Sequence, residues 1–399
     1  MDDDEIEIDT RQPAAGMREN SPIPTSGAWR EGDHPGRRQF FELGDLELDI
    51  DPLGVLPGVR IAYETWGELT AAGDNAVYIA HALTGDSHAT GPAEPGHKTG
   101  GWWPALVGPG KPVDTNKYFV VSANVVSGCQ GSTGPASSHP DDGKPWGSRF
   151  PYVTIRDMVR AEIALTRYLG VPSWRMIIGP SMGGMRALEM AIMAPNLVQS
   201  LGLLGTCAAT TADQLAWNTA QLAAIRADPK FAQGDFYDAA DGDGPHIGMG
   251  IARMIAHTTY RSGSELTSRF GREVQGDGNP LGGRDQFTVE SYLRHHADKL
   301  ARRFDANTYI RLVEAMCSHD VGSGRGGVQD ALSRVAVPAM VMAVDTDRLY
   351  PLSDAQLLAD ALPGAKGVTL MSSAIGHDGL LVDSAKLTEI VRDFVEAVA

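Results

Sequence analysis

Residues Arg175 to Met185 read Arg-Met-Ile-Ile-Gly-Pro-Ser-Met-Gly-Gly-Met, and they are the most informative segment for the fold of this chain. Its first half is a short apolar run typical of a buried strand, and the residues that follow have the composition of a helix. Ser181 therefore lies on a sharp strand-to-helix turn. Glycines at positions 179 and 183 remove side chains that would collide in so tight a bend, and the helix N-terminus offers free backbone N–H groups to a developing negative charge. This pattern predicts a nucleophile elbow.

Short apolar runs of the same kind recur along the chain and predict the strands of one sheet. They are Val59–Trp66, Ala76–Ala80, Tyr118–Ala123, Arg175–Ile178, Leu201–Leu204, Ala339–Val344 and Val368–Met371. Loops and helix-like segments such as 155–169 separate them, which is the rhythm of a mostly parallel sheet with crossover helices. The sheet is expected to end in a C-terminal helix from about residue 384 to residue 398.

The rhythm of strands breaks between about residues 210 and 327, where helix-compatible stretches dominate. These stretches are 212–227, 248–257, 289–303 and 307–317. We interpret residues 210–327 as a helical lid inserted between two strands, above the elbow. The catalytic domain is then formed by residues 38–209 and 328–399, and the acidic residues 1–37 are expected to form a flexible leader.

Composition limits the classes of protein that fit this chain of 399 residues. Its 42% hydrophobic residues suffice for a packed core, and its formal net charge of −16 argues against nucleic acid or an anionic membrane as a partner. The chain has no apolar run of 18 residues and no signal-peptide pattern at Met1–Glu5, so we expect a cytoplasmic protein. Three scattered cysteines give neither a disulfide framework nor a metal site.

A serine hydroxyl is a weak nucleophile, so the elbow needs a general base and an acid that orients the base. The strand expected at 339–344 leads into a loop with Asp345 and Asp347, and the last expected strand leads into a loop with His377. Both loops leave the same edge of the sheet as the elbow. We predict a triad of Ser181, Asp347 and His377. Asp347 is preferred to Asp345 because it lies within the loop and not at the strand end. This order along the chain is that of an α/β-hydrolase fold.

Two backbone N–H groups are needed to bind the tetrahedral oxyanion. The N–H of Met182, directly after the nucleophile, supplies the first. The loop after the strand at 76–80 is the natural source of the second, which we assign to the N–H of Leu83. His81 and His88 lie in the same loop. No Asp or Glu pattern joins them, and triad chemistry needs no metal, so no metal site is predicted.

Eight short motifs add a further line of evidence, and they are quoted as they stand in the chain. They are His81-Ala-Leu-Thr-Gly-Asp-Ser-His88, Gly128-Cys-Gln-Gly-Ser-Thr-Gly-Pro135, Gly147-Ser-Arg-Phe-Pro151, Gly179-Pro-Ser-Met-Gly-Gly-Met185, Ala252-Arg-Met-Ile-Ala-His-Thr-Thr-Tyr-Arg-Ser262, Arg325-Gly-Gly327, Asp347-Arg-Leu-Tyr-Pro351 and Gly376-His-Asp-Gly-Leu380. Together they resemble the homoserine O-acetyltransferase family of α/β-hydrolase-fold acyltransferases, and the actinobacterial members most. The likeness runs from about residue 40 to the C-terminus.

The resemblance implies transfer of an acetyl group from acetyl-CoA to the hydroxyl of L-homoserine through acetyl-Ser181, an activating step toward methionine. Acetyl-CoA is then a substrate, no cofactor is permanently bound, and a homodimer forms through the lids. The family's homoserine contacts fall on Thr84, Arg253, Tyr260 and Asp378. An arginine can clamp the α-carboxylate and a carboxylate can hold the α-ammonium. Arg253 and Tyr260 are seven residues apart, on one helical face.

Residue chemistry by itself leaves the acyl acceptor open. A serine esterase has the same nucleophile, base and acid. Within the family, some members use succinyl-CoA and others acylate serine. A large lid that could exclude water favours a transferase, and the presence of the complete catalytic set disfavours a receptor without activity.

Overall fold

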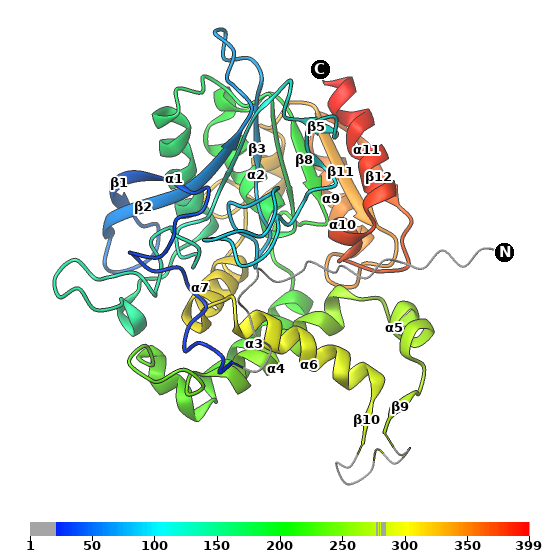
Figure 1. Ribbon diagram of the computed structural model, residues 1–399. Helices are drawn as coiled ribbons and strands as arrows, with labels where there is room; N and C mark the ends of the chain where they lie inside the picture. Colours follow the sequence, from blue (N-terminus) through cyan, green and yellow to red (C-terminus); the bar gives the residue numbers. More distant parts are fainter. Residues whose placement is uncertain (1–20, 277, 279, 281–284, 399) are drawn as a thin grey trace.

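The computed structural model describes residues 21–276, 278, 280 and 285–398. Its centre is an eight-stranded sheet in the order β1-β2-β6-β3-β7-β8-β11-β12 (Figure 1). The strands are β1 (Gln39–Glu47), β2 (Val55–Trp66), β3 (Ala76–Ile79), β6 (Phe119–Ala123), β7 (Met176–Pro180), β8 (Leu201–Leu204), β11 (Ala339–Val344) and β12 (Ala365–Met371). Neighbours from β6 to β12 are parallel, whereas β1 and β2 are antiparallel to their neighbours. The predicted mostly parallel sheet is confirmed.

Helices cover both faces of the sheet, so the central strands β7, β8 and β11 are buried along their whole length. One face carries α1 (Ile155–Tyr168), α2 (Met182–Met193) and α9 (Leu352–Ala361). The other face carries α11 (Ser384–Ala397) together with the loop of Trp102 and Trp103. Two-sided burial explains why these strands read as continuous apolar runs in the sequence.

Shorter elements complete the sheet domain. They are β4 (Val107–Gly108), β5 (Val113–Asp114), η1 (Gly147–Arg149), η2 (Pro195–Leu197), α8 (Val328–Leu332) and α10 (Gly379–Val382). No helix in the described part of the chain is long and apolar enough to cross a membrane.

The segment between β8 and β11 is mainly helical, and in Figure 1 its green and yellow helices lie below the sheet. Its elements are α3 (Ala212–Arg226), η3 (Pro229–Gly234), α4 (His246–Tyr260), α5 (Gly263–Phe270), β9 (Val274–Gln275), β10 (Gln286–Phe287), α6 (Thr288–Ala301) and α7 (Ala306–Cys317). A capping box at Thr211 starts α3, and the Asp305 side chain caps α7. We keep the name lid for residues 210–327.

The predicted flexible leader, residues 1–37, needs a correction. Residues 1–20 lie outside the described residues. In the remainder, Thr25, Ser26 and Ala28 are buried, and the Gly27 N–H donates to the Phe304 carbonyl at 3.0 Å. The chain therefore packs against the lid and the core from well before residue 38. The Pro, Gly and Ser residues of this segment indicate flexibility in the sequence, but such residues also form packed irregular structure.

Candidate active site

Ser181 stands between β7 and α2 in a backbone conformation that side chains rarely adopt, with φ 55° and ψ −122°. Its N–H donates to the Leu204 carbonyl at 2.9 Å. A Cβ atom added at Gly183 would lie 2.1 Å from the Ala80 carbonyl oxygen, and one at Gly179 would lie 2.6 Å from the same oxygen. The bend thus requires glycine on both sides of the serine, as the sequence predicts.

Asp347 and His377 are in direct contact, with Oδ2 of the acid 2.6 Å from Nδ1 of the imidazole. The other carboxylate oxygen of Asp347 accepts hydrogen bonds from the backbone N–H groups of Leu349 at 2.8 Å and Tyr350 at 2.9 Å. Asp345 instead accepts from the Ser373 N–H at 3.0 Å. The structure therefore brings Asp347, and not Asp345, to the histidine.

The ion pair changes the acidity of the histidine. Burial alone would lower the pKa of His377, but the charge and the hydrogen bond of Asp347 raise that pKa above its usual value. The imidazolium that forms when a base accepts a proton is stabilised in the same way.

Gly205, directly after β8, shows how closely the three predicted catalytic residues approach. Its φ is +50°, and a Cβ there would lie 3.3 Å from Cε1 of His377 and 3.4 Å from Oδ2 of Asp347. The preceding residue, Leu204, accepts the hydrogen bond from Ser181. Serine, histidine and acid thus converge at the carboxyl edge of the sheet.

Tyr350 is a residue of this site that the sequence did not single out. Its ring centroid lies 5.2 Å from that of His377, and its hydroxyl interacts with the Ser181 side chain. Burial raises its pKa well above the usual value, so the phenol remains a neutral hydrogen-bonding group. The signal that could have found it is its position three residues after Asp347, in the motif that carries the acid.

The two predicted oxyanion donors belong to elements that are tied together. Among the described residues, no protein group accepts a hydrogen bond from the N–H of Met182 or of Leu83. Arg186, on the elbow helix α2, donates to the His81 carbonyl at 2.7 Å, at the start of the Leu83 loop. The same guanidinium forms a buried ion pair with Glu162 of α1. The elbow helix therefore holds the start of the loop that carries the predicted second donor.

From the lid, α4 presents Arg253 and Tyr260 to this site. The guanidinium lies 5.5 Å from the Tyr260 ring centroid, and that ring lies 5.9 Å from the His377 ring. Nε and Nη1 of Arg253 are buried, and neither has a hydrogen-bond partner within the described parts of the chain. Because unpaired buried charge is costly, this guanidinium is suited to receive an anion.

Asp378 and Thr84 connect the core loops to the lid. Oδ2 of Asp378 lies 3.1 Å from Nε of Arg261, and its N–H donates to the Tyr260 carbonyl at 3.1 Å. The Thr84 carbonyl accepts from Arg303 at 2.7 Å. The structure thus places all four predicted substrate contacts where the lid meets the core, and it gives the Asp378 carboxylate an ion-pair partner that the sequence did not indicate.

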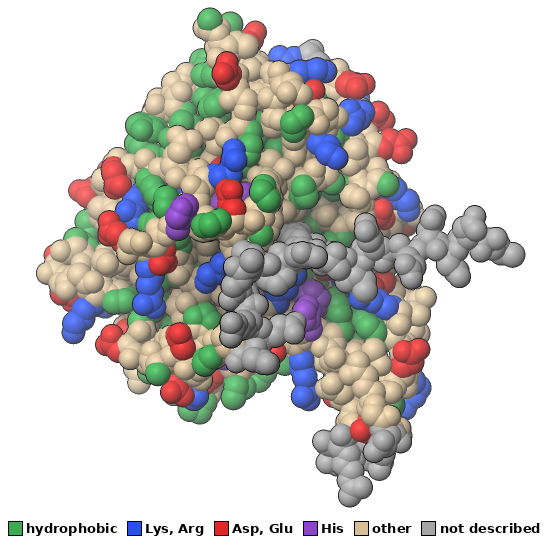
Figure 2. All heavy atoms as spheres, viewed as in Figure 1, with side chains coloured by type: hydrophobic (Ala, Val, Ile, Leu, Met, Phe, Trp, Pro, Cys, Tyr) green, Lys and Arg blue, Asp and Glu red, His purple; other side chains and the backbone are tan. Residues whose placement is uncertain are grey.

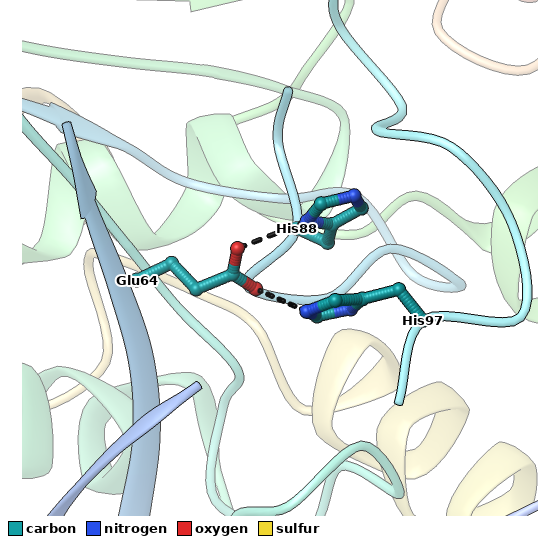
Figure 3. Close-up of side chains that lie close together, drawn as sticks. All are labelled: Glu64, His88 and His97. Carbon is teal, nitrogen blue, oxygen red and sulfur yellow. Dashed lines mark hydrogen bonds and ion pairs between the residues drawn. The ribbon is translucent and has the colours of Figure 1, made fainter. Parts of the chain in front are cut away.

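Glu64, His88 and His97 form a buried cluster at the loop after β3, and this cluster has the composition of a metal site (Figure 3). One ligand atom of each lies within 4.8 Å of the others. The two imidazole rings, however, are stacked, with centroids 3.8 Å apart and planes 13° apart. Imidazole nitrogens bind metals in the plane of the ring, so stacked rings cannot both aim at one ion.

The potential ligand atoms of this cluster already have protein partners. His88 Nδ1 is 2.9 Å from Glu64 Oε2, and His97 Nε2 accepts from the Arg37 N–H at 3.0 Å. Burial alone would lower the pKa of His88, but Glu64 raises it, whereas burial lowers the pKa of His97 to about 3. The geometry suits a hydrogen-bonded structural network better than a metal site. His81 also has partners, since its ring nitrogens contact the Ala82 carbonyl and the Val125 N–H.

Comparison with known proteins first defines the class. A family profile described as alpha/beta hydrolase fold matches residues 75–379. The crystal structure of homoserine O-acetyltransferase from Bacillus anthracis superposes with a TM-score of 0.80, at 24% identity, covering 90% of this chain and 97% of that chain. Esterase E22 superposes with a TM-score of 0.79 at 25% identity, covering 90% and 99%. The chain has the α/β hydrolase fold.

Sequence relatives define the family within that class. The homoserine O-acetyltransferase of Thermobifida fusca is 54% identical over 374 residues, which are 94% of this chain and 98% of that protein. Those of Clavibacter michiganensis subsp. michiganensis and Mycobacterium ulcerans are 50% and 47% identical, covering 90% and 93% of this chain and 93% and 96% of theirs. The chain belongs to the homoserine O-acetyltransferase family, and it is an acyltransferase. The resemblance seen in the sequence motifs is confirmed.

Proposed function

We propose that this chain, acting in the cytoplasm, transfers the acetyl group of acetyl-CoA to the side-chain hydroxyl of L-homoserine. The observation that carries the proposal is the 54% identity, over nearly the whole of both chains, to a protein named homoserine O-acetyltransferase. The Asp347–His377 contact of 2.6 Å beside the Ser181 elbow supports a mechanism through acetyl-Ser181.

In the first half-reaction, neutral His377 accepts the proton of the Ser181 hydroxyl as its oxygen attacks the thioester carbonyl of acetyl-CoA. The N–H groups of Leu83 and Met182 donate to the oxyanion that forms. Collapse of this intermediate breaks the carbon–sulfur bond. His377 returns its proton to the departing thiolate, which leaves as CoA, and acetyl-Ser181 remains.

In the second half-reaction, His377 removes the proton of the homoserine hydroxyl, whose oxygen attacks the acetyl-serine ester. The bond between the acetyl carbon and the Ser181 oxygen then breaks, and His377 returns its proton to that oxygen, which releases O-acetylhomoserine. Nε and Nη1 of Arg253 have no hydrogen-bond partner among the described residues, which supports its role as the clamp of the α-carboxylate. Asp378 holds the α-ammonium, which shares the carboxylate with Arg261. The hydroxyls of Thr84 and Tyr260 orient the rest of the substrate.

The proposed assembly is a homodimer joined through the lids. On α3 and α4, three large apolar side chains are exposed: Leu215 at 37%, Ile247 at 73% and Ile251 at 41%. Ile247 and Ile251 are one helical turn apart and so share a face. A second copy of the chain would remove this apolar surface from water.

Release of free CoA tests the proposed function most completely. The assay supplies acetyl-, propionyl- or succinyl-CoA, each with L-homoserine, L-serine or water as the acceptor. We expect the highest kcat/KM with acetyl-CoA and homoserine. Equal release with water would indicate the esterase alternative, for which the fold of esterase E22 gives a precedent. Faster release with succinyl-CoA or with serine would instead indicate the other specificities in the family.

A further inference from the structure

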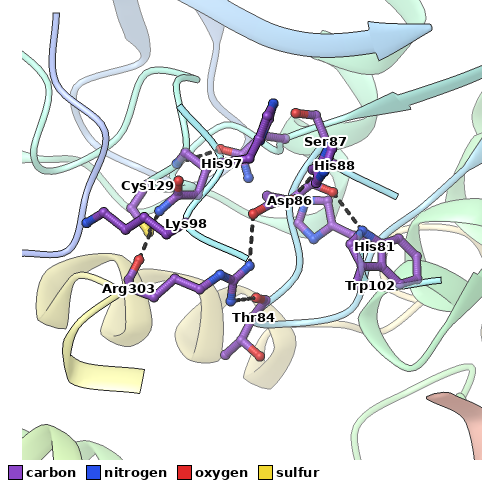
Figure 4. A network of polar contacts seen from close by, with 12 residues as sticks. His81, Thr84, Asp86, Ser87, His88, His97, Lys98, Trp102, Cys129 and Arg303 are labelled. Atoms are coloured by element: carbon purple, nitrogen blue, oxygen red, sulfur yellow. Dashed lines mark hydrogen bonds and ion pairs between the residues drawn. The ribbon is translucent and has the colours of Figure 1, made fainter. Parts of the chain in front are cut away.

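Arg303 lies between α6 and α7 of the lid, and its guanidinium reaches into the loop that follows β3 (Figure 4). Nη1 donates to the Thr84 carbonyl at 2.7 Å, and Nη2 donates to Oδ2 of Asp86 at 2.8 Å. The side chain is only 19% exposed. One arginine therefore holds two points of the loop to which Leu83 belongs.

Asp86 is anchored on its other side by the core. Its second oxygen accepts from the His88 N–H at 2.9 Å, and its carbonyl accepts from the Trp102 indole N–H at 3.0 Å. Burial would raise the pKa of this carboxyl, but the charges of Arg303, Arg38 and His88 hold the pKa well below its usual range. The carboxylate thus stays ionised and keeps its arginine partner.

The backbone that carries Arg303 is itself fixed. The Arg303 carbonyl accepts from Gln130 Nε2 at 2.9 Å, and the next carbonyl, of Phe304, accepts from the Gly27 N–H at 3.0 Å. A Cβ added at Gly27 would lie 2.3 Å from the Arg303 carbonyl carbon. Lys98 Nζ also donates to the Arg302 carbonyl, at 3.3 Å. The backbone that carries the Arg303 guanidinium is therefore held rigidly in place.

The Gly85 N–H donates to the Ala82 carbonyl at 2.9 Å, so residues 82–85 form one closed turn. Because Thr84 and Leu83 belong to the same turn, a displacement of the Thr84 carbonyl also moves the N–H of Leu83. We propose that Arg303 is a positioning residue, which holds this turn so that the Leu83 N–H faces the reacting carbonyl and makes acyl transfer depend on the placement of the lid. The inference rests on the proposed role of Leu83 as an oxyanion donor.

A purely structural link between lid and core would have different consequences, and Arg311 on α7 provides the matched control. Its Nη2 donates to the Phe150 carbonyl at 2.7 Å, and its Nη1 lies 2.8 Å from Glu314. Arg311 therefore also joins a lid helix to a core carbonyl and pairs with a carboxylate, but within the described parts of the chain its polar and ring contacts lie outside the proposed site.

The test measures acetylation of Ser181 by p-nitrophenyl acetate, from the burst of p-nitrophenol and from the mass of the acetylated peptide. Loss of a whole oxyanion donor costs roughly 10²–10³ in kcat, so we expect Arg303→Ala to slow the burst by about 10- to 100-fold with unchanged amplitude. Arg303→Lys should recover part of the rate, because it keeps the charge but loses the two-pronged geometry. Arg311→Ala should acetylate within about twofold of wild type, even where its thermal stability falls as much.

Equal burst rates for Arg303→Ala and Arg311→Ala would overturn the positioning role. Should Arg303→Ala fail to fold, the pair Arg303→Lys and Arg311→Lys decides by the same comparison. A wild-type protein that forms no acetyl-Ser181 would contradict the proposed function and this inference together. A normal wild-type burst that is unaffected in the Arg303 variants would contradict the inference alone.

Discussion

The core and the lid differ in how fully the polar groups of the proposed site are hydrogen-bonded. In the core, the Asp347 carboxylate has three partners: the backbone N–H groups of Leu349 and Tyr350, and the imidazole of His377. In the lid, Arg253 holds two buried nitrogens that no described residue satisfies. We infer from this difference that the proposed acetylating machinery is assembled before substrate binds, whereas the proposed acceptor pocket is completed by an anionic ligand. Variants of the core triad should impair both half-reactions, and variants of the lid residue Arg253 the second one only.

The core variant Asp347→Asn should reduce activity more than the lid variant Arg253→Ala. Without the carboxylate, His377 loses the group that fixes its tautomer and stabilises the imidazolium, and turnover should fall by about 10⁴. Asp345→Asn is the matched control, since among the described residues the Asp345 carboxylate bonds only to a backbone N–H, that of Ser373. The measurement is kcat for both variants. A crippled Asp345→Asn beside an active Asp347→Asn would show that the acid is misassigned.

Arg253→Ala should raise the KM for homoserine well over tenfold, because loss of a charged contact of this kind costs roughly 2–5 kcal/mol. The acetylation burst without acceptor should keep nearly its wild-type rate. Arg269→Ala serves as the control, since Arg269 pairs with Glu265 at 3.4 Å on the lid surface. A collapsed burst with an unchanged homoserine KM would move Arg253 from the acceptor pocket to CoA binding or lid structure.

The acidity of His377 gives a pH dependence of about tenfold per pH unit on the acid side. The imidazole must be neutral to accept the serine proton, and Asp347 raises its pKa. The acetylation rate should therefore increase with pH through a midpoint above about 6.5, the unperturbed value of histidine. A profile of kcat/KM against pH provides the measurement. A midpoint below the unperturbed value would mean that burial, and not the ion pair, dominates in solution.

The exposed lid face should have the smallest effect on chemistry and a clear effect on assembly. Ile247→Asp places a charge on the proposed dimer interface and should shift the protein from dimer to monomer in analytical ultracentrifugation. Ile50→Asp is the matched control, because Ile50 is 63% exposed but lies outside the lid. A wild-type monomer, or dissociation caused equally by both substitutions, would remove the lid face as the interface.

The sequence predicts the central strands well because burial on both faces makes them continuous apolar runs. It misses β1, an edge strand that is mostly exposed and irregular at Gly44. Ser181, Asp347 and His377 are predictable because each follows a strand of a parallel sheet in a fixed chain order. Tyr350 has a local signal as well, since it lies three residues after Asp347 in the same motif.

Contacts between distant segments account for what the sequence does not predict. Arg303 meets Thr84 across 219 positions, and Glu64 of β2 meets His88 of the loop after β3. No local periodicity encodes either contact. The predicted flexible leader, residues 1–37, includes residues 25–28, which are buried in the structure. The sequence does not show this because their partners, such as Phe304, lie far along the chain.

In the proposed mechanism, Ser181 carries the acetyl group between the two half-reactions. Wild-type protein mixed with acetyl-CoA in the absence of acceptor, quenched and digested, should show one added acetyl group on the peptide that contains Ser181. Ser181→Ala should show none while unfolding at nearly the same temperature. Burial raises the pKa of the Cys129 thiol to about 12, so this cysteine should stay unmodified. An acetyl group on Cys129 or another residue, with Ser181 unmodified, would contradict the account.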